Sequence, residues 1–186
     1  GSFGTLQVAS HQVALNLASL TFMVPMGVGM GAAVLVGRAV GRGDPVALRA
    51  SARAALGVGV AFMSCTALMF LTVPRFLAGL YTTDQAVIAF AAVLLPLAGI
   101  FQVFDGLQVV SAGILRGLGD TRAPMLINLV GFGVVGLGMS LVLAYRTPLG
   151  AVGLWWGLVI GLAAVAAILL LRVRVMLARP LRRWNG

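Results

Sequence analysis

Asp105 is the one charged residue in a stretch that runs from Gln85 to Leu115. This stretch is long enough to cross a bilayer, which takes about 20 apolar residues. A carboxylate at the centre of a membrane helix costs about 3 kcal/mol or more, and such residues usually face a protein interior where they relay protons or hold cations. We therefore expect Asp105 to bind a proton or a cation, as ion-coupled transport requires.

The residues three and four positions from Asp105 share its face of the predicted helix. They are Phe101, Gln102, Gln108 and Val109. Two amides can hydrogen-bond a protonated or cation-bound carboxyl group, whereas an isolated ionised carboxylate is strongly disfavoured in apolar surroundings. We predict that Asp105, Gln102 and Gln108 form a cation- or proton-binding site. The alternative is a structural aspartate that bonds a neighbouring helix.

A stripe of polar and sulfur-containing residues, spaced alternately by four and three positions, follows one face of segment 12–37. Methionine is flexible and polarizable and suits surfaces that accept varied apolar partners. We predict that the stripe, together with Phe101, lines a cavity for bulky amphipathic molecules. Alternatively, its amides bond neighbouring helices and its methionines fill packing gaps. The stripe consists of Gln12, Asn16, Ser19, Met23, Met26 and Met30.

Other kinds of chemistry have little support in the sequence. The chain has one His (His11), one Cys (Cys65) and no Glu, so we see no metal triad and no nucleophile–base pair, and we predict neither an enzyme nor a resident cofactor or metal. The net charge of +9 is compatible with nucleic-acid binding, but the composition of a soluble domain and interleaved base-stacking aromatics are missing. We attribute the charge to membrane topology and attraction to anionic lipid.

The composition predicts a protein that resides in lipid. Hydrophobic residues make up 61% of the chain and charged residues 9%, against about 25% charged residues in an average soluble domain. Short turns rich in Gly, Pro, Asp and Arg separate the apolar runs. We predict an all-α membrane protein whose transmembrane bundle occupies residues 1–172, followed by a basic tail at 173–186. The five predicted helices are 12–37, 48–72, 86–115, 124–145 and 150–172.

The arginines predict the orientation, because cytoplasmic loops are enriched in Lys and Arg. Of the 13 basic residues, only Arg75 and Arg146 fall on one side of the predicted bundle, and the others fall on the opposite side or in the tail. We expect the N-terminus outside and the C-terminus in the cytoplasm.

Two loops share a glycine-aspartate pattern, Gly41-Arg42-Gly43-Asp44 and Gly117-Leu118-Gly119-Asp120. Glycine beyond a helix end can adopt the left-handed conformation that closes the helix, and the aspartates can cap the next helix or pair with arginines. A phosphate-binding loop is disfavoured, since neither loop has a Walker A sequence.

The last predicted helix carries glycines at positions 153, 157 and 161. This row of small residues lets another helix approach closely. The sequence does not say whether that helix belongs to the same chain.

The chain resembles a known family, the multidrug and toxic compound extrusion (MATE) transporters of the NorM-like type. The run from Tyr81 to Leu171 is similar to their C-terminal half, and the first predicted helix is similar to their eighth. The motifs that carry the likeness are Phe101-Gln102-Val103-Phe104-Asp105-Gly106-Leu107-Gln108-Val109, Leu115-Arg116-Gly117-Leu118-Gly119-Asp120-Thr121, Gly153-Leu154-Trp155-Trp156-Gly157 and His11-Gln12-Val13-Ala14-Leu15-Asn16.

This resemblance implies a twelve-helix fold in two lobes, located in the bacterial inner membrane, that exchanges drugs or organic cations for H⁺ or Na⁺. The chain then supplies helices eight to twelve, an incomplete C-terminal lobe, and its partner is a missing N-terminal lobe. Asp105 takes the place of the family's cation-binding carboxylate in the tenth helix. A tyrosine common one turn earlier is Phe101 here, and the acidic residue of the seventh helix is absent. The alternative is a membrane packing or assembly protein, or an inactive transporter fragment.

Overall fold

The computed structural model describes residues 5–146 and 150–179, and the secondary structure assigned within these ranges is helical. Five helical stretches are long and apolar enough to cross a membrane, which confirms the predicted fold class. They are α1 (Thr5–Gly41), α2 (Pro45–Thr72), α4 (Gln85–Gly117), a fourth span built from α5 (Arg122–Val130), the π-helix η1 (Gly131–Gly136) and α6 (Leu137–Arg146), and α7 (Gly150–Ala178). A short helix, α3 (Pro74–Gly79), lies in the connection between α2 and α4.

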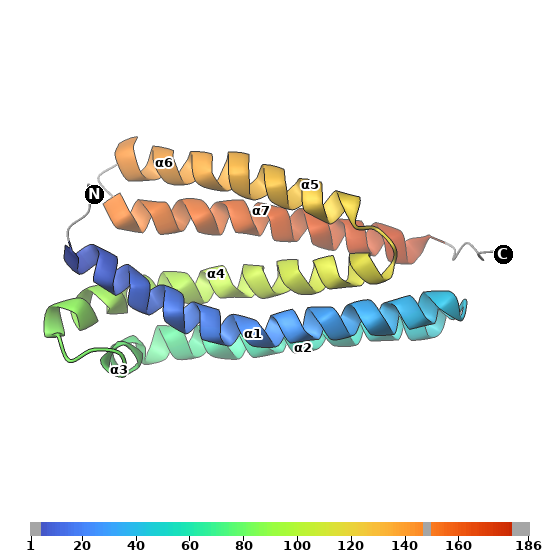
Figure 1. The fold of residues 1–186 in the computed structure, drawn as a ribbon, viewed down its shortest axis with the longest axis horizontal. Coiled ribbons are helices and arrows are strands. Elements are labelled where there is room, and N and C mark those ends of the chain that lie inside the picture. The colour runs from blue at the N-terminus through green and yellow to red at the C-terminus, as the bar shows by residue number, and fades with distance from the viewer. Residues whose placement is uncertain (1–4, 147–149, 180–186) are drawn as a thin grey trace.

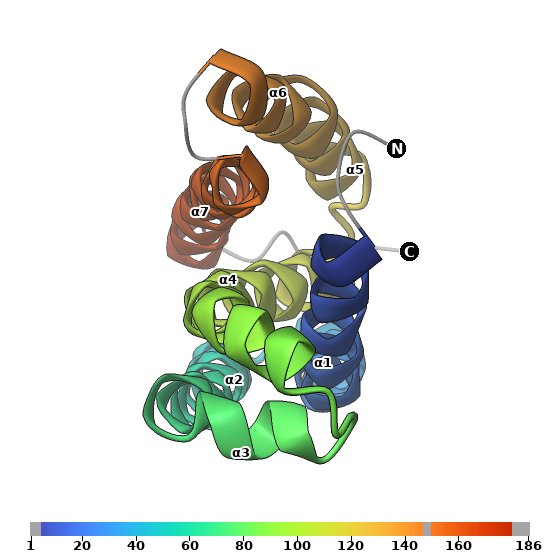
Figure 2. The same ribbon diagram turned by 90° about the vertical axis from the view of Figure 1, so that its left-hand side faces the viewer.

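Helix α4 lies at the centre of the arrangement (Figures 1 and 2). It packs against α1, α2 and α3 on one side and against α7 on the other, and α7 in turn packs against α5, η1 and α6. The central position follows from composition, because α4 is apolar around most of its circumference and has the largest buried share among the five spans. A residue in the middle of α4 is therefore placed between neighbouring helices.

Two clusters of buried apolar side chains hold α4, one toward each of its ends. The first unites α4 with α1, α2 and α3, and the second unites it with α1, α2 and α7. The α4 members of the first cluster end at Ala98, and those of the second begin at Val110. The intervening segment 99–109 contains Gln102, Asp105 and Gln108. The polar residues thus occupy the gap between two hydrophobic cores.

The α1–α4 contact depends on glycine. A Cβ atom placed on Gly113 would lie 2.2 Å from the carbonyl oxygen of Gly29, and one on Gly117 would lie 2.7 Å from the carbonyl oxygen of Ala33. Helix α1 also changes direction near its middle (Figure 1), where Pro25 removes a backbone hydrogen bond. The bent helix and the glycines together bring the two backbones into direct contact.

The glycine row of α7 finds its partner in the fourth span of the same chain. A Cβ on Gly157 would lie 2.3 Å from Cα of Ser140, and one on Gly161 would lie 2.4 Å from Cα of Gly136. The sequence predicted an ordinary helix over 124–145, whereas the structure contains the π-helical turn η1 inside it. This turn contains three glycines, which are weak α-helix formers and which leave room for α7.

Both glycine-aspartate loops close a helix in the predicted way. Gly43 and Gly119 have φ angles of 64° and 80°, in the left-handed region. In each loop the N–H of the following aspartate bonds the carbonyl group five residues earlier, at 3.0 Å for Asp44 and 2.9 Å for Asp120. This is the hydrogen bond of the Schellman motif.

The helices extend beyond the predicted bounds, most of all at the start of α1 and at the end of α7. Helix α7 continues to Ala178, so the first part of the segment expected to be a basic tail is helical. Residues 180–186 of that tail lie outside the described residues.

Replacing Gly113 by Ala should destabilise the chain by about 1–3 kcal/mol, because the added methyl group must displace the backbone of α1. The matched control is Gly31→Ala on α1, where a Cβ meets no atom within 4 Å and where Ala favours the helix by about 1 kcal/mol. Thermal unfolding of the purified chain in detergent measures both. Equal effects of the two substitutions would show that α1 and α4 are not in close contact.

Candidate ion-binding site

Three of the four side-chain carboxylates of the chain serve helix ends. Asp44 and Asp84 each accept two backbone N–H groups from the first turn of the following helix, at 2.9–3.4 Å. These bonds satisfy donors that a helix start leaves free. Asp44 and Asp84 are therefore explained by helix capping.

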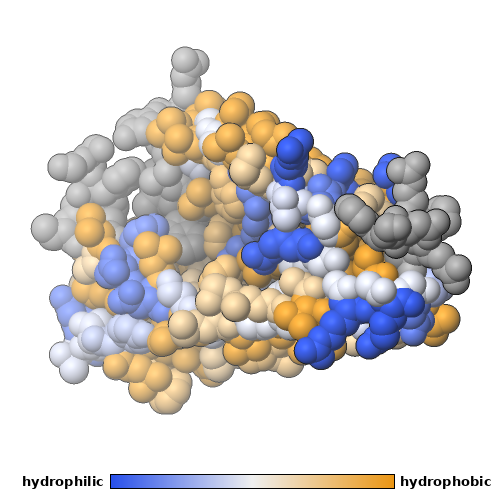
Figure 3. Space-filling view, turned by 45° about the vertical axis from the view of Figure 1, so that its right-hand side comes forward, coloured by the Kyte–Doolittle hydropathy of each residue, from blue (hydrophilic) through white to orange (hydrophobic). Residues whose placement is uncertain are grey.

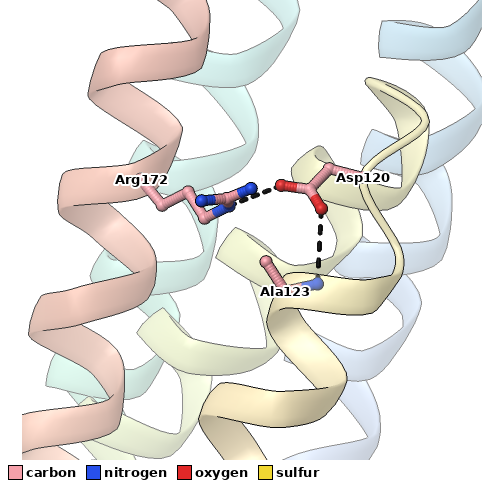
Figure 4. Close-up of polar contacts among 3 residues, drawn as sticks. All are labelled: Asp120, Ala123 and Arg172. Atoms are coloured by element: carbon pink, nitrogen blue, oxygen red, sulfur yellow. Dashed lines mark hydrogen bonds and ion pairs between the residues drawn. The ribbon is translucent and has the colours of Figure 1, made fainter.

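Asp120 has a related structural role at the turn between α4 and α5. Its Oδ1 accepts the N–H of Ala123 at 3.3 Å, and its Oδ2 pairs with Nε of Arg172 on α7 (Figure 4). Among the residues that the structure describes, this is the only ion pair. The predicted cap at Asp44 is confirmed, and Asp120, one residue before the N-cap Thr121, bonds an N–H of the first turn of α5 and pairs with an arginine.

Asp105, the fourth carboxylate, lies in the middle of α4 and is half-buried. No hydrogen bond or ion pair joins its carboxylate to any of the residues in 5–146 and 150–179. An ionised carboxylate in a membrane span is unfavourable without a compensating partner. A bound proton, a bound cation, or a group contributed from outside these residues has to provide that compensation.

Gln102 stands one turn before Asp105 and is 1% exposed. Its Nε2 donates to the carbonyl oxygen of Ala18, at 3.2 Å, and to Oγ1 of Thr21, both on α1. Its Oε1 is buried and has no hydrogen-bond partner among the described residues. The bonds to α1 thus hold the amide in place and leave an unused acceptor oxygen in the interior of the bundle.

Gln108 stands one turn after Asp105 and is 7% exposed. Its Nε2 donates to Oδ1 of Asn128 on α5, at 2.9 Å. The pair lines a hollow of about 320 Å³ between α4 and α5, to which Arg116 and Thr121 also contribute. Gln108 therefore ties α4 to the fourth span.

The two glutamines surround Asp105 along the helix as expected, but their N–H groups bond other helices instead of its carboxyl group. Gln102 bonds α1, which packs against α4, whereas Gln108 bonds Asn128 on α5 beside the hollow between α4 and α5. Sequence reasoning missed those partners, Thr21 and Asn128. The available signal was that each is a polar side chain within an apolar run.

The six stripe residues of α1 are all exposed in this chain. Asn16, Ser19 and Met23 line a surface hollow of about 380 Å³ together with Leu20 and Tyr81. Gln12 donates to Asn16 at 3.3 Å within the stripe. Met23, Met26 and Met30 are 63%, 41% and 61% exposed, so they do not fill gaps in the described bundle.

Phe101, unlike the methionines of the stripe, packs against a buried cluster. It is half-buried and packs against the cluster that includes Leu17 on α1 and Phe70 on α2. No three His, Cys, Asp or Glu side chains gather at any point in the described ranges. The described residues therefore offer Asp105 no cluster of metal-binding side chains.

Sequence comparison identifies relatives of the chain. The family model described as MatE matches residues 1–142. "Multidrug resistance protein NorM" of Burkholderia vietnamiensis is 47% identical over 174 residues, which cover 91% of this chain and 38% of that protein. "Probable multidrug resistance protein NorM" of Brucella suis biovar 1 is 44% identical over 183 residues, which cover 96% of this chain and 39% of that protein. The chain thus spans well under half the length of these curated relatives.

Solved structures share the fold. The crystal structure of the eukaryotic MATE transporter AtDTX14 superposes with a TM-score of 0.85 at 22% identity, covering 91% of this chain and 38% of that one. The crystal structure of MATE in the straight conformation gives a TM-score of 0.86 at 19% identity, covering 94% of this chain and 39% of that one. The five-span arrangement is therefore the one found in part of these larger proteins.

Two substitutions separate the roles of Asp120. Asp120→Asn keeps a side-chain oxygen for Ala123 but removes the charge that faces Arg172, and it should lower the unfolding free energy by about 0.2–1 kcal/mol because the pair is exposed on the arginine side. Asp120→Ala also removes the cap, and the further loss should be about 1 kcal/mol. Thermal unfolding at low and high salt distinguishes the two, since only the first loss is screened. Identical stability of both variants would contradict the capping role.

Proposed function

Because the chain belongs to the MatE family of multidrug and toxic compound extrusion transporters, we propose that it forms part of a secondary antiporter. This antiporter exports drugs or toxic organic cations in exchange for H⁺ or Na⁺. Asp105 binds the coupling ion. The chain spans about 38% of the length of its NorM relatives, so an N-terminal lobe completes the transporter, and alternating access requires both bundles.

The observation that carries the proposal is the missing partner of Asp105. The other three aspartates are occupied at helix ends, whereas this one lies in a span between two apolar clusters without a hydrogen bond or ion pair from the described residues. A carboxylate that is not compensated permanently can exchange its compensating ion. Such exchange is what coupling an export step to an ion gradient requires.

Gln102 supports the same site. An amide oxygen that is buried without a partner costs about 1–3 kcal/mol, and Oε1 of Gln102 is such an atom in the described structure. A cation or a protonated carboxyl group at Asp105 offers it a partner. We propose that Gln108 supplies the second amide of the site through its oxygen, since its amide nitrogen donates to Asn128.

The choice between H⁺ and Na⁺ depends on the number of oxygen ligands. A proton needs only the carboxylate, whereas a hard cation prefers several oxygens. Asp105, Gln102 and Gln108 supply a carboxylate and two amides, and Phe101 adds no oxygen. Na⁺ coupling would therefore require further ligands from the rest of the transporter.

We assign drug binding to the α1 stripe and Phe101. The stripe presents amides at one end and flexible thioethers at the other, and all six residues are exposed on the side of α1 that the described chain does not cover. Gln102 connects the two functions, because it joins α1 at Ala18 and Thr21 to the helix of Asp105. Occupancy of Asp105 can thereby influence the position of α1.

Asp105→Asn should abolish the coupling of drug efflux to the ion gradient. The test uses a chimera in which this chain replaces the matched segment of the Burkholderia vietnamiensis NorM. An amide cannot exchange a proton or neutralise a cation. The factor by which an ion gradient stimulates efflux should therefore be lost, and we expect that factor to be about 5- to 150-fold, the usual range of coupling between two sites. Efflux from cells or vesicles measures it.

The matched control is Asp84→Asn, which makes the same chemical change at a helix cap and should retain coupling because asparagine also caps helices. Immunodetection in membranes verifies insertion of every variant. An Asp105→Asn chimera that exports drug with unchanged pH or Na⁺ dependence would contradict the assignment. A chimera that inserts but exports nothing even when unsubstituted would favour a packing role or an inactive fragment.

Gln102→Leu separates a functional from a structural glutamine. Leucine removes the unpaired oxygen, and Thr21 keeps its bonds to the carbonyl groups of Leu17 and Ala18, so the unfolding free energy should change by no more than about 1 kcal/mol. The ion dependence of efflux should nevertheless weaken. Thermal unfolding and efflux of the same variant are compared. A decrease of several kcal/mol in the unfolding free energy, or an unchanged ion dependence of efflux, would contradict the assignment of Gln102 as a ligand.

A further inference from the structure

The first turns of α2 carry two arginines on one exposed face. Arg49 and Arg53 are four residues apart, which places their side chains side by side, and both are exposed. Two like charges in this position repel each other. The nearest acid in the sequence, Asp44, uses its Oδ1 to cap α2, and among the described residues neither arginine takes part in an ion pair. The charge of this face is therefore not neutralised by any residue within 5–146 and 150–179.

The length of α2 places this arginine pair at a defined depth. Its 28 residues extend roughly 42 Å at about 1.5 Å per residue, whereas the hydrocarbon core of a bilayer is about 30 Å thick and takes about 20 residues. Counted back from Thr72, the apolar part of the span ends near Arg53. Both arginines then lie at the boundary between acyl chains and headgroups, where lipid phosphates are found.

The same face continues into apolar side chains. Val60 follows Arg53 at helical spacing on the hydrocarbon side and is 36% exposed, whereas Val46 precedes Arg49 at the outer end of the helix and is 76% exposed. The residues that α2 buries, among them Leu48, Ala52 and Met63, lie on another part of its circumference. In the space-filling view, hydrophilic residues gather toward this end of the molecule and border hydrophobic surface (Figure 3). Adjacent charged and apolar areas match the two parts of a phospholipid.

From this arrangement we propose that Arg49 and Arg53 bind the phosphate group of an anionic phospholipid, whose acyl chains lie along the exposed apolar face of α2. Guanidinium groups bind phosphate through paired hydrogen bonds, which makes them better suited to this role than ammonium groups. One phosphate between the two arginines also removes their mutual repulsion. The site is independent of Asp105 and of the proposed transport.

Native mass spectrometry of the full chain in detergent tests the proposal, with phosphatidylglycerol as the probe. The unsubstituted chain should retain bound phosphatidylglycerol, and Arg49→Gln combined with Arg53→Gln should weaken its affinity on the order of tenfold to a hundredfold, the range for hydrogen bonds between charged groups. The matched control is Arg174→Gln with Arg179→Gln, which removes the same charge from two exposed arginines of the α7 end that are five residues apart. This control should change the affinity by no more than about fivefold.

Further arms identify the ligand. Phosphatidylcholine should not be retained, because its headgroup carries no net charge, and inorganic phosphate should not displace the lipid. If both double variants lost the same affinity for phosphatidylglycerol, the lipid would be attracted by the net charge of the chain, and the proposed site at Arg49 and Arg53 would be wrong. Displacement by inorganic phosphate, or equal retention of phosphatidylcholine, would overturn the assignment to an anionic lipid. Circular dichroism verifies that each variant keeps its helices.

Discussion

The cost of placing a carboxylate inside a membrane span constrains the whole structure. A charge of this kind is tolerated only with a partner, and the described residues provide partners for every aspartate except the one in the middle of α4. The remaining features follow from the need to hold that residue between helices. Apolar clusters fix α4 on both sides of the polar segment, and within that segment Phe101 packs against the first cluster.

Glycines and amides make this placement possible in different ways. Gly113 and Gly29 bring the backbones of α4 and α1 together, and the glycines of α7 and η1 do the same on the other side of the bundle. The amides of Gln102 and Gln108 then join α4 to α1 and to α5 by side-chain hydrogen bonds. Helices in lipid gain little from apolar contact alone, so close packing and hydrogen bonds have to provide the specificity.

The sequence was sufficient for the class of fold and for the closing of the helix ends. Composition and turns predict five spans, the glycine-aspartate loops predict closed and capped helices, and an isolated aspartate stands out in an uncharged run. Helical spacing could not show which way an amide turns, because that depends on the helix packed against it. Gln102 and Gln108 therefore bond Thr21 and Asn128, which spacing along α4 does not reveal. The π-helical turn η1 was not predicted either, because it lies where the fourth span contacts α7, and that contact is not visible in the local sequence.

The most direct measurement is infrared spectroscopy of the full chain in lipid bilayers, with attention to the carboxyl group of Asp105. The band is assigned by its loss in Asp105→Asn, and it is followed as pH is changed or Na⁺ is added. We expect a carboxyl band that responds reversibly to protons or to Na⁺, while the three aspartates at helix ends do not respond to Na⁺. A band of Asp105 that ignores both ions would show a permanently occupied carboxylate and would contradict its role in coupling.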